Sequence, residues 1–234
     1  MAAPQVVAGV IPAAGYATRL QPLEISKEVY PVGGRPVIDY LIERMRAAPC
    51  DEIRVVTRPD KRDVIEHAVE RGATVIGARP PTLARSVLEG MRGLADDDVV
   101  LLGFPDSIWE PVDGYALVLE RLRDGFEVAL GLFRAADPRR CEPVVVDEAE
   151  RVVRVEFKPE RPSSEWIWGC AAARVAALRG LEHEDEPGHL FDSLAAAGVV
   201  AGVRMSGSYV DMGTPDGLDE AISRSGARTR RTSR

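Results

Sequence analysis

A loop of small residues followed by two cationic side chains has the composition of a phosphate-binding site. The apolar residues 6–11 predict a buried parallel strand. The small residues that follow this strand are Ala13, Ala14, Gly15 and Ala17. Because they carry no bulky side chains, backbone N–H groups can approach a phosphate chain there, and Arg19 and Lys27 add positive charge. The segment therefore indicates a nucleotide-binding loop.

A small-residue loop alone is a weak signal, since Gly and Ala after a strand usually form an ordinary tight turn. The cations Arg19 and Lys27 favour the nucleotide over the turn. The segment matches neither G-x-x-x-x-G-K-[ST] nor G-x-G-x-x-G, so a P-loop kinase and a nicotinamide or flavin dehydrogenase are not favoured.

Two aspartates, Asp106 and Asp211, each follow a short apolar strand. The carboxyl ends of strands in an open α/β sheet are where ligands bind. The ordinary alternative for Asp106 is a turn that begins next to Pro105. Asp211 precedes a helix start at Thr214 and Pro215. The two aspartates are far apart in the sequence, so only the fold could bring them together.

These features resemble the signature of the sugar-1-phosphate nucleotidylyltransferases, commonly written G-x-G-T-R-L-x-P-L followed by P-K. Residues 14–23 of this chain read AGYATRLQPL, and Ser26 and Lys27 follow. Ala17 replaces the second glycine, and Ser26 replaces the proline, as in the thymidylyltransferase branch. Further motifs of this family match in the same order along most of the chain.

The resemblance implies roles for the residues of the first loop and for the aspartates. The implied nucleotide-binding residues are Ala13, Ala14, Gly15, Thr18, Arg19 and Thr82. The implied catalytic residues are Arg19, Lys27 and Asp106. Asp106 and Asp211 would together hold one Mg²⁺ ion, a cation that commonly binds through one or two carboxylates plus substrate phosphates.

On the acceptor side, the resemblance implies that Lys158 grips the phosphate of a sugar 1-phosphate, with Glu156 and Gly169 nearby. A lysine at a strand end is by itself an ordinary surface residue. Phe157 stands where a second carboxylate for sugar hydroxyls is usual. Pro143 lies near a usual glycine and has no N–H to donate. We therefore expect loose discrimination among sugars.

The implied reaction is magnesium-dependent transfer of a nucleotidyl group from a nucleoside triphosphate, with dTTP or UTP favoured, to a sugar 1-phosphate. One alternative is cytidylyl or other nucleotidylyl transfer to a non-glucose phosphorylated or phosphonate acceptor, motivated by Phe157 and Pro143. Another is a catalytically silent regulatory homologue that binds nucleotide. The complete set of charged residues argues against this second alternative.

The elements that would position these residues alternate through the first half of the chain. Strands are expected at residues 6–11, 53–57, 74–76, 99–104 and 128–133, and helices at 36–48, 59–71, 82–94 and 114–123. This alternation predicts a Rossmann-like α/β fold with a mostly parallel, doubly wound sheet. Later strands, at residues 143–147, 152–157 and 166–172, predict antiparallel additions on the acceptor side.

Length and composition set the remaining expectations. A chain of 234 residues with 45% hydrophobic content favours a single domain over residues 1–224, followed by a disordered basic tail at residues 225–234. The net charge of −7 disfavours a nucleic acid polymer as partner. No apolar run reaches the roughly 18 residues of a membrane span. Three cysteines without a close pair suggest a cytoplasmic protein. A homo-oligomer is compatible with the sequence.

Overall fold

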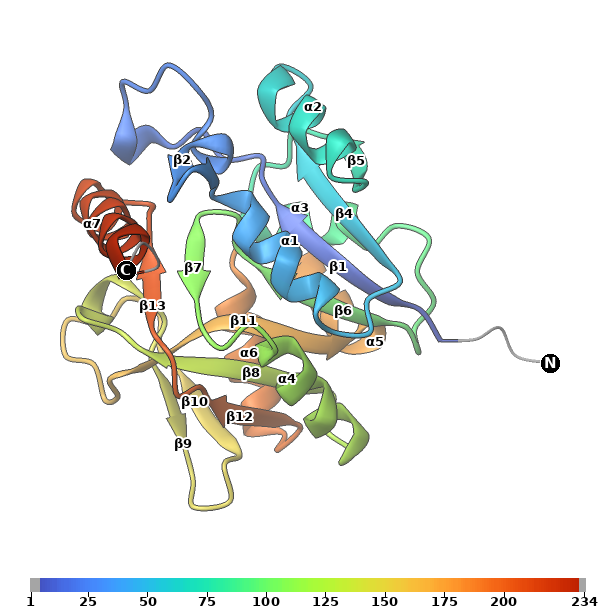
Figure 1. Ribbon diagram of the computed structural model, residues 1–234. Helices are drawn as coiled ribbons and strands as arrows, with labels where there is room; N and C mark the ends of the chain where they lie inside the picture. The colour runs from blue at the N-terminus through green and yellow to red at the C-terminus, as the bar shows by residue number, and fades with distance from the viewer. Residues whose placement is uncertain (1–4, 232–234) are drawn as a thin grey trace.

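The computed structural model describes residues 5–231, with side-chain burial described up to residue 224. A seven-stranded sheet forms the centre, in the spatial order β12-β8-β11-β6-β1-β4-β5 (Figure 1). Its strands are β1 (Val7–Pro12), β4 (Glu52–Thr57), β5 (Thr74–Gly77), β6 (Val99–Gly103), β8 (Val128–Arg134), β11 (Trp166–Arg174) and β12 (Val200–Arg204). Neighbouring strands are parallel except where β11 pairs with β6 and β8, so the sheet is mostly parallel.

Helices cover both faces of this sheet (Figure 1). The core on one face includes side chains from α1 (Ile38–Arg46), α2 (Arg62–Glu70) and α4 (Gly114–Arg123). The core on the other face includes side chains from α3 (Leu83–Gly90), α5 (Val175–Leu178) and α6 (Pro187–Ala196). Adjacent strand residues alternate between the cores, with Ile11 in the first and Val10 in the second. Burial on both faces explains why the strands are continuous apolar runs.

Three short antiparallel pairs lie outside the central sheet. They are β2 (Pro31–Val32) with β3 (Arg35–Pro36), β7 (Ser107–Trp109) with β13 (Tyr209–Asp211), and β9 (Val144–Val146) with β10 (Val152–Val155). The pair β7 and β13 matters most for the site, because its register sets Asp211 opposite Ser107. The C-terminal helix α7 (Pro215–Arg231) begins just after β13 and packs against it.

The predicted Rossmann-like, mostly parallel doubly wound sheet is confirmed. Strand β12 was not predicted, and the strand expected at residues 152–157 ends at Val155. Helix α7 continues through residues 225–231, and residues 232–234 lie outside the described residues, so the expected disorder of the tail stays a prediction. Arginine and alanine are good helix formers and no proline interrupts this stretch, so the helix can extend through it.

Candidate active site

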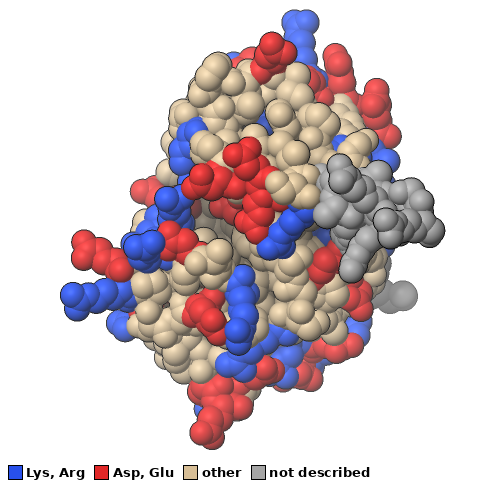
Figure 2. Space-filling model, turned by 60° about the vertical axis from the view of Figure 1, so that its left-hand side comes forward, with Lys and Arg blue, Asp and Glu red and all other residues tan. Residues whose placement is uncertain are grey.

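A cavity of about 800 Å³ lies at the carboxyl ends of β1 and β6. Its lining includes side chains from the loop after β1, the turn after β6, the start of α3 and the region around β9 and β11. Figure 2 shows the molecule with the left-hand side of Figure 1 turned forward. On this face a hollow is bordered by both acidic and basic side chains. The sequence predicted a ligand-binding site at this same edge of the sheet, where the parallel strands end.

The loop after β1 contributes small residues and a cation to the cavity wall. Ala14, Gly15 and Arg19 line the cavity, whereas Ala13 and Thr18 do not. Ala17 has a φ of 52°, a left-handed conformation that glycine adopts freely, and it precedes a single 3-10 turn, η1 (Thr18–Leu20). The chain thus keeps the backbone conformation typical of glycine at the position where it departs from the family signature.

Lys61, at the start of α2, holds this loop in place. Its Nζ donates hydrogen bonds to the carbonyl oxygens of Ala13 and Gly15, both at 3.0 Å, and to Glu28 Oε2 at 2.7 Å. Glu28 is completely buried within a second 3-10 turn, η2 (Lys27–Val29). Sequence reasoning missed this pair, because a lysine before a helix and a glutamate beside Lys27 are ordinary on their own.

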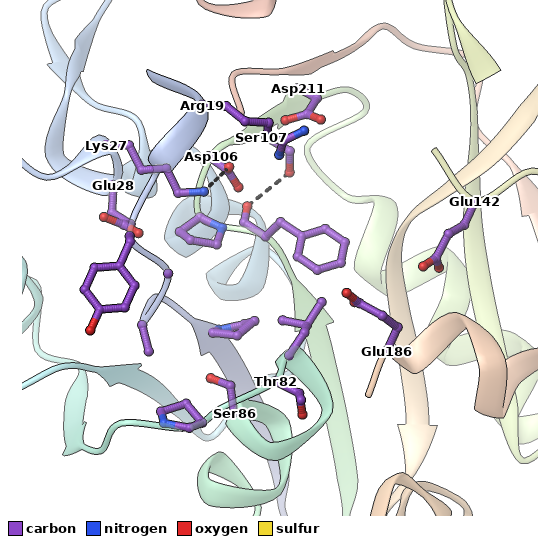
Figure 3. Close-up of a pocket in the computed structure, with 18 of the residues that line it drawn as sticks. Arg19, Lys27, Glu28, Thr82, Ser86, Asp106, Ser107, Glu142, Glu186 and Asp211 are labelled. Carbon is purple, nitrogen blue, oxygen red and sulfur yellow. Dashed lines mark hydrogen bonds and ion pairs between the residues drawn. The ribbon is translucent and has the colours of Figure 1, made fainter. Parts of the chain in front are cut away.

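Lys27 and Asp106 form an ion pair of 2.6 Å inside the cavity (Figure 3). Burial would lower the pKa of Lys27, but the charge of Asp106 and the hydrogen bond to it raise that pKa above its ordinary value. The β7–β13 pairing brings in Asp211, and the Met212 N–H donates to the Asp106 carbonyl oxygen at 2.9 Å. Burial and the charge of Asp106 both raise the pKa of Asp211.

The two aspartates and Arg19 converge on Gly213. A Cβ at this glycine would lie 2.9 Å from Asp211 Oδ1, 3.0 Å from Arg19 Nη2 and 3.3 Å from Asp106 Oδ2. Two carboxylates this close together repel one another, and a divalent cation bound between them would neutralise their charge. Hard divalent cations bind through carboxylate oxygens of this kind. Within residues 5–231 no cluster of three or more His, Cys, Asp or Glu side chains forms a metal site, so phosphates and water would complete the coordination.

The opposite end of the cavity is lined by Lys158, Glu142, Glu186 and Trp168. Burial raises the pKa of Glu142 to about 7, although a hydrogen bond from Trp168 Nε1 opposes this. Burial also raises the pKa of Glu186. Figure 3 shows both carboxylates directed into the cavity, on the opposite side from Lys27. The two glutamates were not predicted. In the segment that contains Glu142, only Pro143 and its missing N–H were considered.

Two predicted acceptor residues lie outside this cavity, and so does the Phe157 ring. Glu156 accepts hydrogen bonds from Ser163 N and Oγ, at 2.9 and 2.7 Å. Gly169 turns its α-carbon toward the rings of Tyr209 and Phe133. The Phe157 ring is 41% exposed and packs on His189, with 4.8 Å between ring centroids.

The expectation that Phe157 shapes the acceptor pocket stays a prediction: the ring lines a neighbouring groove, and Lys158 Nζ lies 4.5 Å from its centroid. Strand β10 ends at Val155, and Lys158 has a φ of 41°, so the chain turns there. Glu156 and Phe157 line a separate groove, while Lys158 lines the main cavity. Pro143 is also absent from the lining of the main cavity.

A third part of the cavity is lined by Tyr16, Arg58, Arg79 and Thr82. The Arg58 guanidinium stacks 3.6 Å from the centroid of the Tyr16 ring. Asp60 forms ion pairs with both Arg58 and Arg79, at 3.0 and 2.9 Å. The Thr82 hydroxyl accepts a hydrogen bond from Arg85 N and caps α3, so it contributes structure as well as cavity wall. The wall of this part of the cavity thus includes one aromatic ring, from Tyr16, and two guanidinium groups, from Arg58 and Arg79.

None of the described helices is long and apolar enough to cross a membrane. By sequence, the chain is 26% identical over 167 residues to a glucose-1-phosphate thymidylyltransferase of Neisseria meningitidis, covering 68% of this chain and 58% of that protein. It is 30% identical over 175 residues to the bifunctional protein GlmU of Rhodopseudomonas palustris, covering 73% and 38%. The chain thus spans only about half, or less, of the length of these relatives.

By structure, the chain is similar to a UDP-glucose pyrophosphorylase from Acinetobacter baumannii, with a TM-score of 0.78 and 19% identity, covering 93% of this chain and 92% of that one. A likeness at this identity shows a shared fold. The family model described as the MobA-like NTP transferase domain matches residues 9–160, which include the phosphate loop and Asp106. From this match, the chain belongs to the family of MobA-like NTP transferase domains.

Proposed function

We propose that this chain transfers a nucleotidyl group from a nucleoside triphosphate to the phosphate of a sugar 1-phosphate and releases pyrophosphate. The observation that carries the proposal is one cavity with cations at two places, Arg19 and Lys27 at one end and Lys158 at the other. Such a cavity can hold two anions together. The names of the relatives, thymidylyltransferase and pyrophosphorylase, support the same reaction class.

The proposed reaction is an in-line displacement that depends on positioning and charge. An oxygen of the acceptor phosphate attacks the α-phosphorus, and the bond to the leaving pyrophosphate breaks. Lys27 would stabilise the α-phosphate, Arg19 the pyrophosphate, and Lys158 the acceptor phosphate. No nucleophilic side chain is required. Because Asp106 already holds Lys27 in the cavity, the ammonium group is positioned before the nucleotide arrives.

Asp106 and Asp211 are the residues that would hold a Mg²⁺ ion. When bound, the ion supplies positive charge to phosphate oxygens. The convergence of the two carboxylates on Gly213 and the raised pKa of Asp211 support this assignment. Magnesium is the natural candidate because it commonly keeps few protein ligands and shares phosphates.

UTP and dTTP remain the favoured nucleotides, with glucose 1-phosphate as the simplest acceptor. The argument for a phosphonate or other acceptor is weaker, because Phe157 and Pro143 do not line the main cavity, although the Phe157 ring still contacts Lys158 Nζ. Glu142 and Glu186 instead provide carboxylates for acceptor hydroxyls. A silent homologue is disfavoured by the complete set of cations and aspartates in one cavity.

The test is a pyrophosphate-release screen of ATP, GTP, CTP, UTP and dTTP against glucose, mannose and N-acetylglucosamine 1-phosphates, with and without Mg²⁺. We expect release with UTP or dTTP, dependent on both the sugar phosphate and the metal. Release only with CTP and a non-sugar phosphate would support the alternative acceptor class. Nucleotide binding without release for any pair would overturn the proposal in favour of a silent homologue.

A further inference from the structure

A buried carboxylate oxygen in the cavity wall has no hydrogen-bond partner. Glu28 lines the cavity and is completely buried. Its Oε2 accepts a hydrogen bond from Lys61 at 2.7 Å, whereas its Oε1 has no partner in the part of the chain that the structure describes. Buried polar atoms normally have a partner, and an unsatisfied one costs free energy. The contact with Lys61 therefore satisfies only one of the two carboxylate oxygens of Glu28.

The position and charge of Glu28 restrict what could satisfy Oε1. Lys27 is attracted to both Asp106 and Glu28, so Glu28 adjoins the proposed phosphate site (Figure 3). The burial of Glu28 raises its pKa, while the charge of Lys61 opposes this. A carboxylate repels phosphate and accepts hydrogen bonds, so its partner must be an uncharged or cationic donor.

In a nucleoside triphosphate, the group attached directly to the α-phosphate is the ribose. Its hydroxyls are uncharged hydrogen-bond donors. The acceptor end of the cavity is remote from Glu28, as Figure 3 shows for Glu142 and Glu186, so the sugar acceptor is not the nearer source of a hydroxyl. A ribose hydroxyl is therefore the donor that best matches the unpartnered Oε1.

We propose that Glu28 is a specificity-determining residue that accepts a hydrogen bond from a hydroxyl of the nucleotide ribose. The inference rests on the proposed function, since it needs the triphosphate at Arg19 and Lys27. It explains why a carboxylate, and not an apolar side chain, occupies a completely buried position in the wall.

The test compares kcat/KM for UTP, 2′-deoxy-UTP and 3′-deoxy-UTP, each with glucose 1-phosphate and Mg²⁺. We expect removal of at least one hydroxyl to lower kcat/KM of the wild type at least about tenfold. Glu28→Leu, which removes both acceptor oxygens, should bring that ratio close to one. Loss of loop structure alone would lower kcat/KM for all three nucleotides equally and leave the ratio unchanged.

Two further variants separate positioning from recognition. Lys61→Met removes the partner of Oε2 but keeps Glu28, so it should lower turnover while retaining the discrimination. Glu186→Gln, at the acceptor end, should leave the ratio unchanged. Equal use of all three nucleotides by the wild type, or discrimination retained in Glu28→Leu, would overturn the inference. Absence of product with every nucleotide would instead contradict the proposed function.

Discussion

Asp106 has two tasks, because it holds the ammonium of Lys27 and faces Asp211 across the space beside Gly213. Neither task can be performed by a neutral amide. We predict that Asp106→Asn and Asp211→Asn each lower kcat at least about a hundredfold under saturating Mg²⁺. Both variants should remain folded, as judged by circular dichroism. Asp97→Asn, an exposed change before β6, is the control, and near wild-type turnover of either site variant would contradict the assignment.

Glu142 should leave a signature in the pH dependence of stability. Its pKa in the folded protein is about 7, whereas a glutamate in an unfolded chain titrates near about 4.3. As the pH rises through this window the unfolded chain ionises first, so wild-type stability falls. The stability of Glu142→Gln does not fall in this way, because glutamine has no carboxyl group to ionise. Its stability relative to the wild type should therefore rise from pH ~5 to pH ~8, by up to the order of 3 kcal/mol.

Urea unfolding at the two pH values measures this difference. Glu156 is the control, because hydrogen bonds from Ser163 lower its pKa. Its stabilising contribution is complete above the ordinary pKa of a glutamate and is lost only in more acidic solution. Glu156→Gln should therefore show a constant difference over this range. Parallel pH profiles for the wild type and Glu142→Gln would contradict the buried, proton-binding state of Glu142.

At the scale of elements, the connection from α2 to the phosphate loop depends on Lys61. Its ammonium group joins two loop carbonyls to Glu28, so Lys61→Met should loosen the loop. We predict that this variant lowers kcat/KM for the triphosphate at least about tenfold and changes the KM for glucose 1-phosphate little. Arg62→Met, an exposed neighbour, is the control. An equal effect on both substrates would indicate a general loss of stability.

After β10, two neighbouring side chains line different hollows, although Lys158 Nζ lies 4.5 Å from the centroid of the Phe157 ring. Lys158 lines the main cavity, and Phe157 lines the groove with His189. We predict that Lys158→Ala raises the KM for glucose 1-phosphate at least about tenfold, whereas Phe157→Ala changes it less than about threefold. Steady-state kinetics with varied acceptor measure both. A large effect of Phe157→Ala on the acceptor would contradict this placement.

The sequence predicted the central sheet well because strands buried on both faces are unbroken apolar runs separated by amphipathic helices. It also placed Arg19, Lys27 and Asp106 at one edge. It could not predict the β7–β13 register, which brings Asp211 to Asp106, or the partners Lys61 and Glu28. Pairing between distant segments depends on tertiary structure. The positive φ of Lys158 could not be predicted, because the residue is not a glycine, although Pro159 directly after it indicates a turn.

At the scale of the whole molecule, the site extends beyond the region that the family model matches. The match ends at residue 160, whereas Asp211 and Glu186 follow it. The structural likeness covers nearly the whole chain, so the later segments share the fold of that neighbour. Expectations about acceptor choice therefore depend on both parts of the chain, because Glu142 and Lys158 lie within the match and Glu186 follows it.

The most direct measurement of the central claim follows the oxygen atoms. Glucose 1-phosphate labelled with ¹⁸O in its terminal phosphate oxygens is incubated with UTP, Mg²⁺ and the protein, and both products are analysed by mass spectrometry. If the acceptor phosphate attacks the α-phosphorus, the nucleoside diphosphate sugar keeps all of the label and the pyrophosphate has none. Label in the pyrophosphate, or formation of uridine monophosphate without a nucleotide sugar, would contradict transfer between two anions held in one cavity.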